Sequence, residues 1–168
     1  ITERSKTEPL SPYGKSKLDA EEQIRKLAVG IDAIILRLFN VYGNGQNEKY
    51  SGVISKFLKN ISEDKPIVIY GDGKQTRDFV SIYDVTDAFS AAISSQYSGT
   101  YNIASGRSIS VNDLAKIMLE TSGKNLEIIY KKEKTGDIKF SQCDISLAQK
   151  LGFSPKIDLK KGLEDLVS

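Results

Sequence analysis

The chain has 168 residues, 39% apolar and 27% charged, which predicts one ordinary globular domain or part of a larger protein. Its 24 basic and 22 acidic residues are interspersed, which argues against a nucleic-acid-binding surface. There is no histidine and only one cysteine, Cys143, which excludes histidine-dependent catalysis and an internal disulfide, and we expect no metal site. The polar N-terminal residues and the absence of a long apolar run predict a cytoplasmic protein without membrane contact.

Predicted helices and strands alternate along the chain, which indicates an α/β fold. The first helix is expected to begin at Ser11 and Pro12, a favourable N-cap and first helical position, and to end at Gly30. The apolar run over residues 31–39 lacks alternation, so it predicts a strand covered on both faces, as in a parallel sheet. Residues 40–52 are rich in Gly and Asn and predict a loop.

The alternation continues to the end of the sequence. Further strands are expected at residues 66–70, 78–82, 100–104 and 126–130. Further helices are expected at residues 53–61, 84–94, 110–121, 146–151 and 159–166. Ser110 and Asp113 form a capping box that predicts one helix start, and Gly123 predicts the end of that helix. The first residue is Ile1 rather than a starting methionine, which together with the motifs below favours a fragment of a longer protein.

A tyrosine four residues before a lysine occurs three times, and only the first copy lies in a predicted helix. On a helix, Tyr13 and Lys17 share one face about 6 Å apart, so a phenol and an ammonium group can converge on one substrate. A free tyrosine has a pKa near ~10, and a nearby cation favours the phenolate that a general base needs. A solvated helix turn is the alternative interpretation. The other copies straddle a glycine turn or leave a strand for a loop (Tyr70/Lys74 and Tyr130/Lys134).

Six sequence blocks follow one another across nearly the whole chain: SPYGKSKLDAEE, LRLFNVYGNGQ, YSGVISKFL, PIVIYGDGKQTRDFVSIYDV, TYNIASGRSISVNDLA and KTGDIKFSQCDISLAQKLGF. Together they resemble the extended short-chain dehydrogenases and reductases, specifically nucleotide-sugar epimerases of the UDP-glucose 4-epimerase type. The resemblance implies the C-terminal part of a Rossmann-type parallel sheet over residues 1–46 and a small α/β nucleotide-sugar-binding domain over residues 47–168. Elements at about residues 84–105 are candidates for packing back onto the Rossmann sheet. The glycine-rich turn that holds the NAD pyrophosphate is absent from the sequence, so only the C-terminal half of such an enzyme is represented.

The resemblance further implies NAD-dependent epimerisation at C4 of a UDP-sugar through a 4-keto intermediate. Tyr13 would take the proton of the 4-hydroxyl while hydride passes from C4 to NAD, and Lys17 would contact the nicotinamide ribose and lower the tyrosine pKa. Leu38 and Phe39 would line the nicotinamide side of the cofactor. The resemblance also implies contacts with the substrate. Asn40 would contact the sugar-diphosphate region, and Arg77 and Lys134 would bind the diphosphate. Val53 and Tyr70 would lie near the base, and Asp137 would bind the nucleoside ribose.

Structural explanations compete with several of these roles: Asn40 and Asp137 suit turns, Arg77 suits a surface ion pair, and Tyr70 suits an ordinary strand position. Lys134 replaces the arginine that is usual in the family, and a lysine loses the bidentate contact to phosphate. A nucleotide-sugar 4,6-dehydratase, a decarboxylase or a non-catalytic nucleotide-sugar-binding module are the functional alternatives. Because most of the NAD site lies outside this sequence, we expect the 168-residue chain alone to be inactive. Family members are commonly homodimers, and the sequence leaves the oligomeric state open.

Overall fold

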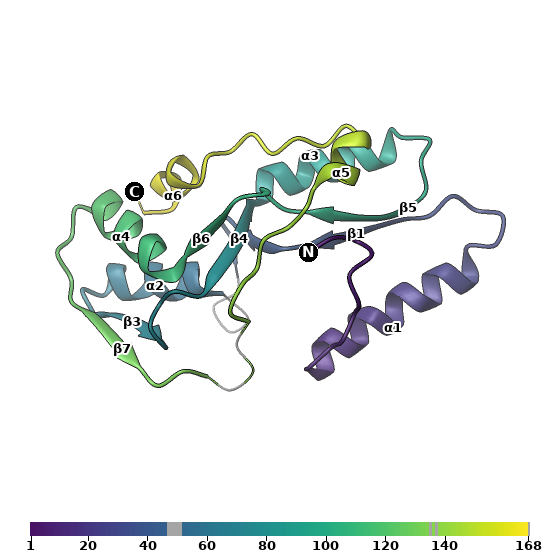
Figure 1. The fold of residues 1–168 in the computed structure, drawn as a ribbon. Helices are drawn as coiled ribbons and strands as arrows, with labels where there is room; N and C mark the ends of the chain where they lie inside the picture. The colour runs from purple at the N-terminus through teal and green to yellow at the C-terminus, as the bar shows by residue number, and fades with distance from the viewer. Residues whose placement is uncertain (47–51, 135, 137, 168) are drawn as a thin grey trace.

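The computed structural model describes residues 1–46, 52–134, 136 and 138–167, in which helices and strands alternate (Figure 1). The helices are α1 (Pro12–Leu27), α2 (Val53–Ser62), α3 (Ile82–Ile93), α4 (Val111–Ser122), α5 (Ser146–Lys150) and α6 (Leu159–Val167). The strands are β1 (Ile34–Leu38), β2 (Asn40–Tyr42), β3 (Ile67–Tyr70), β4 (Thr76–Ser81), β5 (Gly99–Ile103), β6 (Ser108–Ser110) and β7 (Ile128–Lys131). All helices expected from the sequence are present. Among the described residues, no helix is long and apolar enough to cross a membrane.

The described strands pair mainly in parallel, between segments far apart in the sequence. β1 lies parallel to β5, with Ile34 opposite Gly99, and β3 lies parallel to β7. β4 lies between β2, to which it is parallel, and β6, to which it is antiparallel. Parallel pairing requires long crossover connections, and the intervening helices provide them. This arrangement is the α/β organisation that the sequence predicted.

Two strand predictions were wrong. The sequence indicated a loop where Asn40–Tyr42 form β2, and it indicated no strand where Ser108–Ser110 form β6. Both are three-residue strands, too short for a periodic pattern, and both are strands because they pair with β4. Tertiary pairing therefore overrides weak local preference here. Residues 47–51 of the predicted loop lie outside the described residues.

Three signals at helix ends were confirmed, whereas α1 ends at Leu27, three residues before the predicted Gly30. The hydroxyl of Ser11 accepts a hydrogen bond from the backbone N–H of Gly14 at 3.1 Å, which caps α1. The hydroxyl of Ser110 accepts one from the N–H of Asp113 at 3.0 Å, which caps α4. Gly123 ends α4 in the left-handed conformation, with φ +65°. These ends depend only on neighbouring residues, which is why the sequence predicts them well.

Two clusters of buried apolar side chains form the core. The first joins α2, α4, α6 and β3 and includes Phe57, Ile67, Leu114, Met118 and Leu163. The second packs α3 and α5 against β4 and β5 and includes Val80, Val85, Ala88, Ile103 and Phe153. α3 and α5 lie on one side of the β1–β5 pair and α1 lies on the other (Figure 1). In the described structure α1 has no buried residue.

Buried carboxylates fasten the loops around β4. Asp78 is fully buried and accepts hydrogen bonds from the N–H and hydroxyl of Ser105 at 2.8 and 2.7 Å and from the N–H of Cys143 at 3.3 Å. Asp84 accepts from the N–H groups of Lys156 and Ile157 at 2.8 and 3.2 Å. Cys143 is buried, and burial raises the pKa of its thiol to about 12, so this side chain is packed and unreactive. The chain after β7 is thus held against β4.

Candidate functional site

One cavity of about 570 Å³ is lined by most of the residues that the sequence singled out. Eight of the ten predicted site residues line it: Tyr13, Leu38, Phe39, Asn40, Val53, Tyr70, Arg77 and Lys134. They come from α1, the end of β1, the start of β2, α2, β3, β4 and the segment after β7. The cavity thus includes the carboxyl end of β1, the edge at which open α/β sheets bind ligands. The fold brings together residues separated by up to 121 positions (Tyr13 to Lys134).

The chain changes sheets at the wall of this cavity. Leu38 ends β1 and is 43% exposed, and the N–H of Phe39 still donates to the carbonyl of Ile103 at 3.0 Å. Asn40 then begins β2, and its side-chain amide donates to the backbone carbonyl of Asp78 on β4 at 2.9 Å. Asn40 is therefore a fixed strand residue facing β4, and its alternative interpretation as a turn residue was wrong.

Tyr13 and Lys17 lie together on α1. The Lys17 ammonium is 5.3 Å from the centroid of the Tyr13 ring, as expected for neighbours on successive helical turns. Tyr13 is 71% exposed and lines the cavity. Lys17 does not line it, so the structure places this lysine beside the tyrosine rather than at the cavity wall.

A second cation–aromatic pair lines the cavity on other elements. The Lys134 ammonium lies 4.0 Å from the centroid of the Tyr70 ring, at the end of β3. The side-chain amide of Gln75 donates to the Tyr70 carbonyl at 2.7 Å, which fixes the backbone at this point. Tyr70 and Gln75 also line an adjoining cavity of about 420 Å³. Tyr70 therefore borders both cavities.

Arg77 lies on β4, lines the cavity, and joins this strand to the segment after β7. Its guanidinium donates to the carbonyl of Thr76 at 2.8 Å and also to the carbonyl of Ile138, in the segment after β7. A planar guanidinium held by backbone carbonyls keeps its other N–H groups oriented, which suits recognition of phosphate oxygens. Asp137, the remaining predicted site residue, lies outside the described residues.

The sequence interpretation missed eleven lining residues, among them Gln46, Lys56, Phe57 and Gln75. Lys56 and Phe57 follow Val53 by three and four positions on α2, so helical spacing was the signal that could have found them. The described lining contains three cationic side chains, Lys56, Arg77 and Lys134, and no carboxylate. Such a cavity favours an anionic ligand. Among the described residues, no cluster of His, Cys, Asp and Glu is suited to a metal ion.

Comparison with known proteins gives a consistent result. The profile of the NAD dependent epimerase/dehydratase family matches residues 1–104. A protein of Methanocaldococcus jannaschii described as a putative UDP-glucose 4-epimerase is 40% identical over 171 aligned residues, which cover 100% of this chain and 56% of that protein. The chain thus spans about half the length of the curated relatives it matches.

Solved structures agree closely with the fold. UDP-glucose 4-epimerase from Thermotoga maritima, solved with UDP-glucose, matches with a TM-score of 0.95 and 33% identity, covering 99% of this chain and 55% of the other. UDP-glucuronic acid 4-epimerase from Bacillus cereus, solved with UDP-glucuronic acid and NAD, matches with a TM-score of 0.90 and 34% identity over 99% and 55% of the two chains. The Rossmann-type α/β fold expected from the sequence is confirmed by these matches.

Proposed function

The chain belongs to the NAD dependent epimerase/dehydratase family, and from this premise we propose that its full-length protein interconverts C4 epimers of a UDP-glucose-type nucleotide sugar. The observation that carries the proposal is the single cavity in which Tyr13, supported by Lys17, is combined with three cationic side chains. A nucleotide sugar has both an anionic diphosphate and a reactive sugar hydroxyl, so it matches this combination. In this proposal residues 1–46 belong to the NAD-binding domain and residues 47–168 to the nucleotide-sugar-binding domain.

The residues present fit the nicotinamide end of NAD. Leu38, partly exposed at the carboxyl end of the parallel strand β1, lines the same cavity as Phe39 and Tyr13. Dinucleotides bind at this edge of such sheets. We assign Leu38 and Phe39 to the nicotinamide side and Lys17 to its ribose. When bound, NAD supplies the acceptor and donor of hydride for C4 of the sugar.

The side chains of this chain hold the substrate and move its proton. Arg77 and Lys134 neutralise the diphosphate, and the Asn40 side chain contacts the sugar-diphosphate region. Val53 and Tyr70 contact the base, and Asp137 contacts the ribose. Tyr13 accepts the proton of the 4-hydroxyl and returns it to the 4-keto oxygen after the sugar has turned over. The Lys17 ammonium lies 5.3 Å from the centroid of the Tyr13 ring, beside the proposed acid–base group.

The test is turnover of UDP-glucose and UDP-galactose by the full-length protein supplied with NAD. Tyr13→Phe is expected to lower kcat by about 10²–10⁴-fold, because it removes the general acid–base group. Tyr97→Phe, which changes a 58% exposed tyrosine outside the cavity in the same way, serves as the matched control. Formation of the C4 epimer supports the proposal. Release of water from UDP-glucose would instead identify a dehydratase. A decarboxylase would release carbon dioxide only from a sugar with a carboxyl group at C6, so UDP-glucuronic acid is assayed in parallel.

The 168-residue chain itself is expected to bind a UDP-sugar without turning it over. Eight predicted site residues already line one cavity in this chain, but its sequence has no glycine-rich turn for the NAD pyrophosphate. A UDP-sugar at a hundredfold excess over its Kd should stabilise the folded chain by about 2.7 kcal/mol, measured by thermal unfolding. Arg77→Ala should remove most of this shift. Turnover by the chain alone would contradict the proposal.

A further inference from the structure

Helix α1 carries the proposed acid–base pair, yet it is attached to the rest of the described structure without a buried apolar face. None of its residues is buried, and Ile24 and Leu27 are 43% and 76% exposed. An amphipathic helix usually gains its position from apolar packing. The position of Tyr13 relative to β1 therefore depends on other contacts within the described chain.

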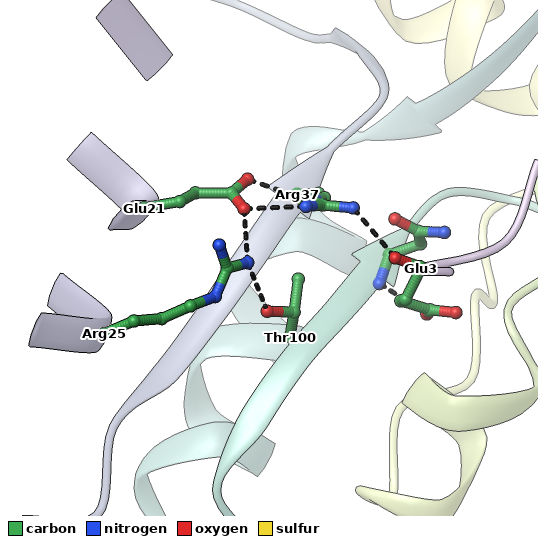
Figure 2. A network of polar contacts seen from close by, with 6 residues as sticks. Glu3, Glu21, Arg25, Arg37 and Thr100 are labelled. Atoms are coloured by element: carbon green, nitrogen blue, oxygen red, sulfur yellow. Dashed lines mark hydrogen bonds and ion pairs between the residues drawn. The ribbon is translucent and has the colours of Figure 1, made fainter. Parts of the chain in front are cut away.

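A polar network centred on Glu21 makes these contacts (Figure 2). The Glu21 carboxylate accepts hydrogen bonds from Nε and Nη2 of Arg37, on β1, at 2.8 and 2.7 Å. It also accepts one from Nη2 of Arg25 at 2.7 Å, and Arg25 donates to the hydroxyl of Thr100, on β5, at 3.3 Å. Arg37 in turn donates to the backbone carbonyl of Glu3 at 3.2 Å. One carboxylate thus joins the helix to both strands and to the N-terminal segment.

Glu21 and Arg37 form a bidentate, partly buried ion pair, which is a strong type of charged contact. The two side chains are only 15% and 21% exposed, so water screens the charges less than at an open surface. The hydrogen bond from Arg37 lowers the pKa of Glu21, which keeps the carboxylate charged at neutral pH. The strands alternate so that Arg37 and Thr100 point to the α1 side, while Leu36 and Ile103 point to the second core cluster.

The network is also aligned with the proposed chemistry. Tyr13, Lys17 and Glu21 follow one another at four-residue intervals, so they lie along one face of α1. Arg37 directly precedes Leu38, which lines the cavity. Glu21 lies eight residues from Tyr13, about 12 Å along a helix, so a tilt of about 5° at Glu21 would move Tyr13 by about 1 Å. Displacements of that size are large enough to lower a catalytic rate about 10²-fold.

We propose that Glu21 and Arg37 are positioning residues that hold Tyr13 and Lys17 against the carboxyl end of β1. The proposal rests on the epimerase function proposed above. Glu21 and Arg37 touch neither substrate nor cofactor in it. Their effect is on the proton and hydride steps at C4, whereas substrate binding depends on residues of other elements, such as Arg77 and Lys134.

The experiment uses the full-length protein loaded with NAD. Glu21→Gln, which preserves shape and removes charge, is expected to lower kcat about 10- to 100-fold while the KM for the UDP-sugar stays close to wild type. The kinetic isotope effect measured with a UDP-sugar deuterated at C4 should increase, because a misaligned site makes hydride transfer more rate-limiting. A merely structural role lowers the number of active molecules and does not change an isotope effect. Glu22→Gln, the same change at the exposed next position, is the control.

The outcomes separate this proposal from the function on which it rests. A wild-type protein that converts no UDP-sugar overturns the proposed function and the positioning role together. An active wild type with an unaffected Glu21→Gln variant overturns the positioning role alone, as does a loss of kcat that matches the folded, NAD-bound fraction with an unchanged isotope effect. If Glu21→Gln does not fold, Arg37→Lys keeps the charge but loses the bidentate contact, and it should show the same pattern with a smaller loss.

Discussion

Helices α4 and α1 illustrate two ways of attaching a helix to one molecule. α4 has 12 residues and buries Val111, Leu114, Ala115 and Met118 in the first core cluster. α1 has 16 residues and buries none, and hydrogen bonds to the Glu21 carboxylate hold it to β1. Close packing fixes α4 through many short-range contacts, whereas a few directional, charged contacts fix α1. The stability of the described structure is therefore expected to reside around α4, while the proposed acid–base chemistry resides on α1.

Cavity-creating substitutions should show this difference most strongly. Leu114→Ala removes a fully buried side chain from α4 and is expected to cost about 2–5 kcal/mol of unfolding free energy. Leu18→Ala removes a partly exposed side chain from α1 and should cost well under half as much. Urea denaturation of both variants gives the comparison. Equal costs would show that α1 is attached by packing after all.

Alanine substitutions at two glycines should also cost more stability next to α4 than next to α1. Gly73 (φ +73°) and Gly30 (φ +78°) both have left-handed backbones, so alanine at either position costs about 1–2 kcal/mol. At Gly73 a Cβ would also lie 1.9 Å from Oδ1 of Asn112, whose amide holds the carbonyl of Asp72 at 2.9 Å. At Gly30 nothing lies within 4 Å. Gly73→Ala should be the more destabilising by at least about 1 kcal/mol, measured by thermal unfolding.

The charged attachment of α1 should be sensitive to acid. The hydrogen bond from Arg37 lowers the pKa of Glu21 below its ordinary value of 4.5. The stability that Glu21 contributes is therefore present above pH 4.5 and is lost as the pH falls through its lowered pKa in the folded protein. Asp78 makes stability depend on pH in the opposite direction, because burial raises its pKa. Its contribution to stability is present below pH 3.8 and is lost as the pH rises through its raised pKa in the folded protein.

Comparing wild type with Glu21→Gln isolates the pH dependence of stability that comes from Glu21. Urea midpoints measured from about pH 3 to pH 6 should rise less steeply with pH in the variant than in wild type. Parallel curves would mean that the Glu21–Arg37 pair adds no stability. This change in unfolding free energy is expected to be smaller than the cost of Leu114→Ala or Gly73→Ala, because part of the Glu21–Arg37 pair is open to solvent.

The smallest effect is expected at a buried phenol. The Tyr42 hydroxyl is buried in the first cluster without a hydrogen-bond partner in the described structure, and burial raises its pKa to about 12. Tyr42→Phe should therefore be neutral or slightly stabilising. Tyr101→Phe removes a hydroxyl that donates to the Ser98 carbonyl at 3.2 Å, and it should cost about 1 kcal/mol. A larger loss for Tyr42→Phe would reveal a partner for this hydroxyl.

Local features of this protein followed from the sequence by itself. The caps at Ser11 and Ser110, the left-handed Gly123 and the placement of Tyr13 and Lys17 on one helical face depend on residues at most four positions apart. Backbone geometry imposes these relations wherever the helix forms. The ordered motifs added the family, which the comparisons show.

Only the tertiary structure decided the rest, because it depends on pairing between distant segments. β2 and β6 are strands through their partner β4, and no three-residue pattern contains that information. Gln46 and Gln75 line the cavity because the loop after β2 and the loop before β4 meet α2 there. The contact of Glu21 with Arg37 spans 16 positions and two elements, so it required the actual distance between α1 and β1. Sequence signals act over a few residues, whereas a cavity or an interelement ion pair is a property of the packed chain.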